Sequence, residues 1–153
     1  MEATPGTIVF QSAPNGSGTE RPAIFACPAT GCVGVPVQFT GDGLMAYFSR
    51  GRESDALNAA IEICRRLDDA RSSAKADDPV HYLYAGVGLC TGLVREGNIG
   101  SAQKYDYTLL GDSVNSAARL EGVTRKVDSL IVFDESMLKG MSSSPSALRK
   151  LGL

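Results

Sequence analysis

The clearest pattern of apolar and polar positions along the chain begins at Val35 and predicts a β-hairpin. Two short apolar segments, Val37–Phe39 and Leu44–Phe48, flank the sequence Gly41-Asp42-Gly43. An Asp-Gly pair between two such segments is a strong signal for antiparallel strands joined by a tight turn. We therefore expect a hairpin with Asp42 in its turn.

Two longer segments and one short segment are expected to be helical. Between Ser54 and Ala76, apolar residues recur at helical intervals, at Leu57, Ala60, Ile61, Cys64 and Leu67. Ser54 or Asp55 can cap the start of this helix, and Asp77-Asp78-Pro79 ends it. A second helix is predicted over Asp112–Gly122 and a short third one over Glu135–Met141.

The segments between these helices predict strands. His81–Thr91 is aromatic and aliphatic, as expected of a central strand, and Gly92–Ile99 is expected to hold a turn and a returning strand. Ser101–Asp106 has the polar composition of a loop, and Leu130–Phe133 predicts a short buried strand. This order indicates an α+β fold, with an antiparallel or mixed sheet and helices on one face.

The first 35 residues differ from the rest of the chain. They are rich in Gly, Pro, Ser, Thr and Ala, and their two apolar pieces, Thr7–Phe10 and Ala23–Cys27, lack the boundaries of a strand. Such a composition is typical of loop or poorly ordered chain. We therefore expect residues 1–35 to be a separate loop-like segment and residues 36–153 to form the folded domain.

Composition excludes several classes of function. The 153 residues fit one domain with ordinary globular proportions of 43% hydrophobic and 21% charged residues. A formal net charge of -2 offers no basic surface for nucleic acid, and no apolar run is long enough to span a bilayer. The N-terminus does not resemble a signal peptide, so we expect a cytoplasmic location.

The cysteines and glycines favour structural roles. Cys27, Cys32, Cys64 and Cys90 share the chain with one histidine, His81, which is too few ligands at suitable spacing for a zinc site. We expect reduced thiols, buried at Cys64 and Cys90. The glycine-rich sequence 86–92 lacks the spacing of a dinucleotide-binding loop and instead predicts close backbone packing of a strand.

Three polar residues have both a structural and a functional interpretation. Asp42 favours a turn, but a carboxylate at a hairpin turn can also hold a hard cation that carries phosphates. Asn115 and Arg119 are four residues apart and share one helix face, where an arginine can bind phosphate oxygens or simply be exposed. Spacing alone leaves these alternatives open.

Three linked motifs resemble the catalytic domain of class III nucleotidyl cyclases, of the adenylate cyclase kind. The sequence FTGDGLMAYF at residues 39–48 resembles the metal-binding hairpin of that family. The sequences GLCTG at 88–92 and GNIG at 97–100 resemble its next strand pair. The sequence YDYTLLGDSVNSAARLE at 105–121 resembles its signature loop and helix. The resemblance runs from Val37 to Lys139 with the motifs in order.

The resemblance implies a fold and an activity. The fold would be ferredoxin-like, of the βαββαβ type, assembled as a head-to-tail homodimer or heterodimer with active sites at the interface. The activity would be that of an adenylate cyclase, a lyase of intracellular signalling that converts ATP to 3′,5′-cyclic AMP and pyrophosphate. Two metal ions, Mg²⁺ or Mn²⁺, would activate the attacking hydroxyl and offset charge on the leaving group.

The resemblance also assigns roles to residues of this chain. Asp42 matches one of the two metal-binding aspartates, and Asn115 matches the asparagine that orients the ribose. Arg119 matches the arginine that stabilises the transition state, a role suited to the negative charge at phosphorus. Thr108 stands where the family has an aspartate or threonine that helps to select adenine.

The sequence departs from the family pattern in three places. No aspartate precedes Asp42, although the family's opening strand carries the second metal aspartate. Gln38 stands where the family has an adenine-selecting lysine, and the later lysine that contacts the triphosphate would fall beyond Leu153. The resemblance therefore implies a domain that is incomplete at both ends. The alternative function is a catalytically inactive nucleotide-binding or regulatory dimerisation partner with the cyclase fold.

Overall fold

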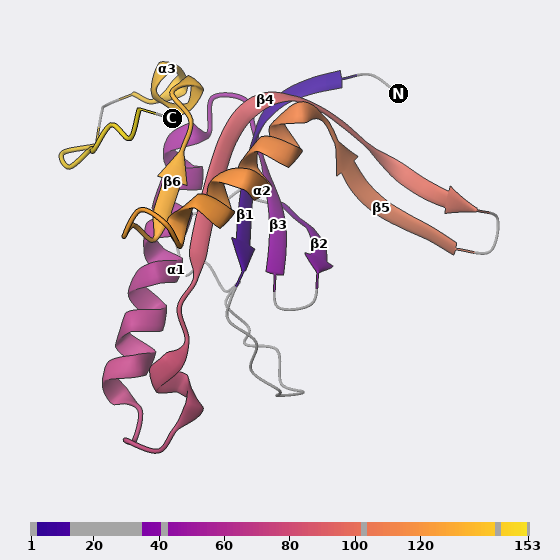
Figure 1. Cartoon of the computed structure of the whole chain (residues 1–153). Coiled ribbons are helices and arrows are strands. Elements are labelled where there is room, and N and C mark those ends of the chain that lie inside the picture. The colour runs from indigo at the N-terminus through magenta and orange to yellow at the C-terminus, as the bar shows by residue number, and fades with distance from the viewer. Residues whose placement is uncertain (1–2, 13–34, 41–42, 102–103, 143–144, 153) are drawn as a thin grey trace.

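The computed structural model describes residues 3–12, 35–40, 43–101, 104–142 and 145–152. Figure 1 shows its strands and helices along the chain. The strands are β1 Ala3–Ser12, β2 Val35–Thr40, β3 Gly43–Ser49, β4 Gly86–Ser101, β5 Lys104–Leu110 and β6 Ile131–Phe133. The helices are α1 Glu53–Ser73, the 3₁₀ helix η1 Pro79–Tyr82, α2 Asp112–Thr124 and α3 Ser136–Gly140.

The strands form one mixed sheet. Its order is β2-β3-β1-β4-β5, with every neighbouring pair antiparallel, and β6 pairs in parallel with Val87–Leu89 of β4. The antiparallel order β2-β3-β1-β4 is that of a ferredoxin-like sheet. The predicted α+β class and the ferredoxin-like arrangement are therefore confirmed.

The central strand is β1, at a place where the sequence predicted a loop. Ala3–Ser12 pairs with β3 along one edge and with β4 along the other. The expectation of a loop over residues 1–35, and of a sheet without an N-terminal strand, is thus wrong for these ten residues. Thr4-Pro5-Gly6 is a weak local signal for a strand, and pairing along both edges overrides it. The second apolar piece, Ala23–Cys27, lies outside the described residues.

Of the other predicted elements, some are confirmed and some differ in type or extent. β4 runs unbroken for 16 residues through Gly92, where a turn was expected. Of the polar loop predicted over Ser101–Asp106, Ser101 ends β4 and Lys104–Asp106 begin β5. His81 lies in η1 instead of a strand, because the carboxylate of Asp78 accepts a hydrogen bond from the Val80 amide at 2.9 Å and starts a 3₁₀ turn. The β2–β3 hairpin, α1, α2, β6 and α3 are confirmed, with boundaries within a few residues of those expected.

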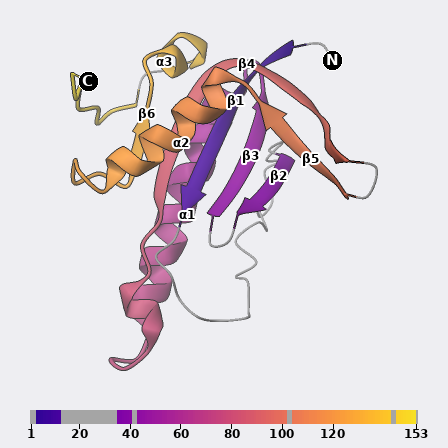
Figure 2. The ribbon, with the colours of Figure 1, turned by 45° about the vertical axis from the view of Figure 1, so that its right-hand side comes forward.

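The helices cover both faces of the sheet, whereas one face was expected. One buried cluster joins Ala46, Phe48, Val87 and Leu89 of the sheet to α1 and α3. A second cluster joins Met45 and Cys90 to Ala117 of α2. Successive strand residues such as Met45 and Ala46 face opposite sides, so these clusters lie on the two faces. Figure 2 accordingly shows α2 in front of the sheet and α1 behind it.

Two leucines on β4 test how stability is distributed. Leu89 is fully buried in the cluster beneath α1, whereas the side chain of Leu93 is 63% exposed. We expect Leu89→Ala to lower the free energy of unfolding by about 2–5 kcal/mol through lost burial and a cavity. Leu93→Ala is the matched control and should change it by no more than about 0.5 kcal/mol. Urea denaturation measures both, and equal losses would contradict the assigned core.

Candidate active site

Asn115 and Arg119 lie on the outer face of α2. Both are exposed, whereas Ser113, Ala117, Glu121 and Thr124 are the buried residues of this helix. At about 100° per residue around the helix axis, Asn115 and Arg119 each lie roughly 160° from the mean direction of these four buried residues. These two side chains are therefore presented away from the chain's own sheet.

The start of α2 is fixed to β4 by a close contact. A Cβ placed at Gly111 would lie 2.6 Å from the carbonyl oxygen of Leu93. Two residues later, the Ser113 hydroxyl donates a hydrogen bond to the same carbonyl at 3.1 Å. The turn between β5 and α2 is thus closed against β4, which fixes where the helix begins.

The glycine-rich strand lies directly beneath α2. A Cβ at Gly88 would collide with the backbone of the helix at Ala117 and Glu121, and a Cβ at Gly92 would lie 2.8 Å from the Cβ of Ser113. A Cβ at Gly86 would collide with the Thr124 hydroxyl. The prediction that these glycines allow close backbone packing is confirmed, and the packing partner is the helix that carries Asn115 and Arg119.

The two predicted purine-contacting residues, Gln38 and Thr108, lie on strands that contact each other. Gln38 lies on β2, where it pairs with Met45, and Thr108 lies half-buried on β5, where it pairs with Gly97. Although β2 and β5 are the two ends of the strand order, they contact each other. The curl of the sheet therefore brings the backbone positions of both predicted residues to one side of the domain.

The predicted metal ligand Asp42 lies outside the described residues. On either side of it, Thr40 pairs with Gly43, as the predicted hairpin requires. Beside this hairpin, Gln11 of β1 pairs with Leu44, so Ser12 is the residue of β1 nearest to the start of β3. Sequence reasoning missed Ser12, and the apolar run Thr7–Phe10 before it was the signal that could have found it.

In the part of the chain that the structure describes, the donor groups of a two-metal site are not assembled. The ten residues of β1 include no Asp or Glu, and Asp42 remains the candidate carboxylate of the hairpin. Among the described residues, no group of three His, Cys, Asp or Glu side chains is placed to hold a metal ion. The strand β1 therefore does not supply the second carboxylate that the family resemblance implies.

The described cysteines are suited to packing. Burial and the neighbouring Asp134 carboxylate raise the pKa of Cys90 to about 12, and burial raises the pKa of Cys64 to about 11. Because the thiolate is the form that attacks or binds metals, both side chains are held in their inert form at neutral pH. Cys90 is buried as expected, whereas Cys64 is only half-buried, and Cys27 and Cys32 lie outside the described residues.

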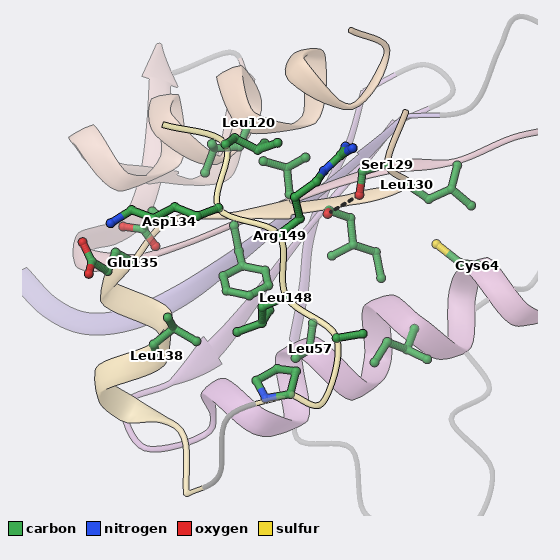
Figure 3. Close-up of a pocket in the computed structure, with 18 of the residues that line it drawn as sticks. Leu57, Cys64, Leu120, Ser129, Leu130, Asp134, Glu135, Leu138, Leu148 and Arg149 are labelled. Carbon is green, nitrogen blue, oxygen red and sulfur yellow. Dashed lines mark hydrogen bonds between the residues drawn. The ribbon is translucent and has the colours of Figure 1, made fainter. Parts of the chain in front are cut away.

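An apolar cavity lies apart from the predicted site. It has a volume of about 870 Å³ and lies between α1, β6 and the segment 145–152 (Figure 3). Its lining includes Leu57, Cys64, Leu120, Leu138 and Leu148. Gln38, Thr108, Asn115 and Arg119 are not part of that lining. The cavity therefore does not correspond to the predicted nucleotide site.

Comparison with known proteins points to one family. No protein-family model matches the chain. An adenylate cyclase of Anabaena cylindrica is 34% identical over 112 residues, which are 71% of this chain and 22% of that protein. The chain thus spans about a fifth of the length of this curated relative.

Solved structures of cyclases share the fold. A bacterial light-regulated adenylyl cyclase superposes with a TM-score of 0.78 at 28% identity, covering 94% of this chain and 46% of that one. The guanylyl cyclase Cya2 superposes with a TM-score of 0.71 at 21% identity, covering 99% of this chain and 88% of that one, which is evidence of fold alone. In the described part of the chain, no helix is long and apolar enough to cross a membrane.

The motifs, the strand order and these relatives agree. The hairpin around Asp42, the glycine-rich strand and the helix with Asn115 and Arg119 occur in the order that the family pattern requires. The sequence relative and the superposed structures are cyclases. The chain belongs to the class III nucleotidyl cyclase catalytic domains.

Proposed function

We propose that this chain supplies the nucleotide-contacting half of an adenylate cyclase active site. A partner domain of the same family supplies both metal-binding carboxylates, and the pair converts ATP to 3′,5′-cyclic AMP and pyrophosphate. The observation that carries this proposal is the outward presentation of Asn115 and Arg119 on α2. Groups directed away from their own sheet can meet the metal-binding groups of a second domain placed head to tail.

The proposed chemistry assigns one task to each outer residue. The ribose 3′-hydroxyl attacks the α-phosphate, and pyrophosphate leaves. The Asn115 amide can donate to and accept from the ribose, which would orient the attacking hydroxyl. The Arg119 guanidinium can bind the phosphate oxygens and stabilise the negative charge that develops during attack. Bound Mg²⁺ or Mn²⁺ would activate the hydroxyl and offset charge on pyrophosphate.

Exposed leucines near α2 support a partner surface. Leu93 on β4 is 63% exposed and Leu110 at the end of β5 is 51% exposed. Leu110 pairs with Arg95, two residues beyond Leu93, so both leucines lie where β5 leads into α2. Large apolar side chains gathered beside a functional helix are typical of an interaction surface. Because Gly92 faces Ser113 of α2 and residues alternate along a strand, both leucines face the side of the sheet away from α2. A partner that covers them would contact the end of the β4–β5 pair that leads into the helix.

The proposed purine contacts are both uncharged. Gln38 can donate to a ring nitrogen and accept from an amine, and the Thr108 hydroxyl can do either. Neither side chain carries the charge of the lysine that the family places at position 38. ATP is the proposed substrate, with weak discrimination against GTP.

A catalytically silent partner is the second candidate function. The absence of a carboxylate from β1 favours it, because two-metal chemistry with one carboxylate would lose metal affinity and charge neutralisation together. In this case the chain would bind a nucleotide or a cyclase domain without turnover. Complementation separates the two functions.

The first experiment pairs this chain with a complete cyclase domain whose own asparagine and arginine are replaced by alanine. That partner should be inactive by itself, so cyclic AMP must come from the mixed site. We expect mixing to restore activity, and Arg119→Ala or Asn115→Ala in this chain to abolish it. Since both residues are exposed, these variants should change the free energy of unfolding by no more than about 0.5 kcal/mol.

Purification of the mixed dimer by two affinity tags is the control for pairing. A demonstrated mixed dimer without cyclic AMP production would overturn the catalytic proposal and leave the silent partner. Restored activity that survives Arg119→Ala would instead show that another group stabilises the phosphate charge.

The second experiment adds a carboxylate to the isolated chain. The native chain should produce little or no cyclic AMP from ATP with Mn²⁺, since it brings only Asp42. Ser12 ends β1 beside the hairpin, so Ser12→Asp should produce measurable Mn²⁺-dependent activity that Asp42→Ala removes. Gln11→Asp is the matched control, because adjacent strand residues point to opposite faces.

Cyclic AMP formation is followed by mass spectrometry at equal protein concentrations. Robust activity of the native chain would show that one carboxylate suffices. Activity in the Gln11→Asp variant and not in Ser12→Asp would show that the second donor belongs at the neighbouring position.

A further inference from the structure

We propose that Gly88 is a positioning residue, whose lack of a side chain sets the height of α2 above β4 and thereby the position of Arg119. The inference rests on the proposed function for its catalytic consequence. It concerns a glycine that touches neither nucleotide nor metal in the proposed mechanism.

Gly88 differs from the other glycines of β4 that face α2 in the kind of atom that it contacts. A Cβ at Gly88 would collide with the carbonyl oxygen of Ala117 and the amide nitrogen of Glu121, which are backbone atoms of α2. A Cβ at Gly86 or Gly92 would meet side-chain atoms, of Thr124 and Ser113 respectively. The Thr124 hydroxyl can move by a change of rotamer, and the Ser113 Cβ at 2.8 Å needs only a small shift. The backbone atoms that face Gly88 can yield only if the helix moves. Gly88 is therefore the point at which the helix and the strand are closest.

The geometry of α2 passes a displacement at Gly88 to Arg119. The start of the helix is held by the Ser113 hydrogen bond to the Leu93 carbonyl, at 3.1 Å. Arg119 lies midway between the two residues that contact Gly88, on the opposite face of the helix. Asn115 lies half a turn from the anchored Ser113. A side chain at position 88 should thus lift Arg119 more than Asn115.

The expected displacement is large enough to affect catalysis. Ordinary carbon contacts lie at about 3.5–4.0 Å, so a methyl group at position 88 requires a shift of α2 on the order of 1 Å. A misplacement of about 1 Å can lower a rate by about a hundredfold. Because Arg119 is assigned to the transition state, the loss should appear in kcat while KM changes little.

The kinetic test uses Gly88→Ala in the mixed dimer. We expect kcat to fall by about a hundredfold and KM to change by less than about threefold. Gly122→Ala is the matched control, because it adds the same methyl group to α2 at a position where a Cβ meets nothing within 4 Å. Because Gly122 does not face β4, the kcat of Gly122→Ala should fall far less than that of Gly88→Ala. An unchanged kcat in Gly88→Ala would overturn the proposal.

A second readout is independent of activity. Cys90 is 5% exposed, and its thiol packs beneath α2 against Ser116 and Ala117. If the helix is lifted in Gly88→Ala, N-ethylmaleimide should alkylate Cys90 of the folded chain at least tenfold faster than in the native chain. The rate is measured by mass spectrometry of the Cys90-containing peptide after digestion. Cys64, on α1 across the sheet, is the internal reference and should not change. The Gly122→Ala variant should react like the native chain.

The kinetics of the mixed dimer and the alkylation of Cys90 distinguish failure of the Gly88 proposal from failure of the proposed function. A silent native mixed dimer would refute the proposed function, and unchanged Cys90 alkylation in Gly88→Ala would refute the role of Gly88 in either case. Faster Cys90 alkylation with an unchanged kcat would show that α2 moves without consequence for Arg119, which also overturns the proposal. If Gly88→Ala does not fold, Gly92→Ala displaces the start of α2 instead, because its new methyl group would meet the Ser113 Cβ at 2.8 Å. Unchanged kcat and unchanged Cys90 alkylation in that variant would refute the idea that the height of α2 above β4 matters.

Discussion

The approach of α2 to β4 is the constraint on which the arrangement of the candidate site depends. At Gly88 the strand and the helix meet backbone to backbone, and the Ser113 hydrogen bond holds the start of the helix at the same strand. A helix seated this closely has one buried stripe and one outer face, with little freedom to rotate. The exposure of Asn115 and Arg119 follows from that seating.

The same strand also organises the centre of the sheet. Along one edge, β4 pairs with β1 over Gly86–Arg95. Along the opposite edge it pairs with β6 at Val87–Leu89 and with β5 over Arg95–Ser101. β1 in turn is held between two strands, because it pairs with β4 over Ala3–Ser12 and with β3 over Gly6–Gln11. Pairing with β3 and β4 needs only the backbone of β1, so the strand forms although its sequence contains no Asp or Glu. The sheet is therefore kept without the metal-binding carboxylate that the family resemblance implies on this strand.

These features divide the proposed chemistry between two chains. The groups proposed to bind ribose and phosphate, Asn115 and Arg119, lie on the outer face of α2. The strands that carry the proposed purine contacts Gln38 and Thr108, β2 and β5, are in contact. Exposed Leu93 and Leu110 lie at the end of the β4–β5 pair that leads into α2. A domain whose proposed nucleotide contacts face outward, and whose strand β1 carries no carboxylate, is suited to act as one member of a pair.

Local patterns in the sequence determined the elements with strong periodicity and the identity of the family. The Asp-Gly hairpin, the spacing of Leu57, Ala60 and Cys64, and the signature around Asn115 and Arg119 each carry their signal within about 20 residues. Only the tertiary structure decided that Ala3–Ser12 is the central strand, that Gly92 continues β4, and that α1 and α2 lie on opposite faces. The reason is physical: the pairing of strands far apart in sequence and the contact of Gly88 with a helix backbone arise between segments, and no local spacing encodes them.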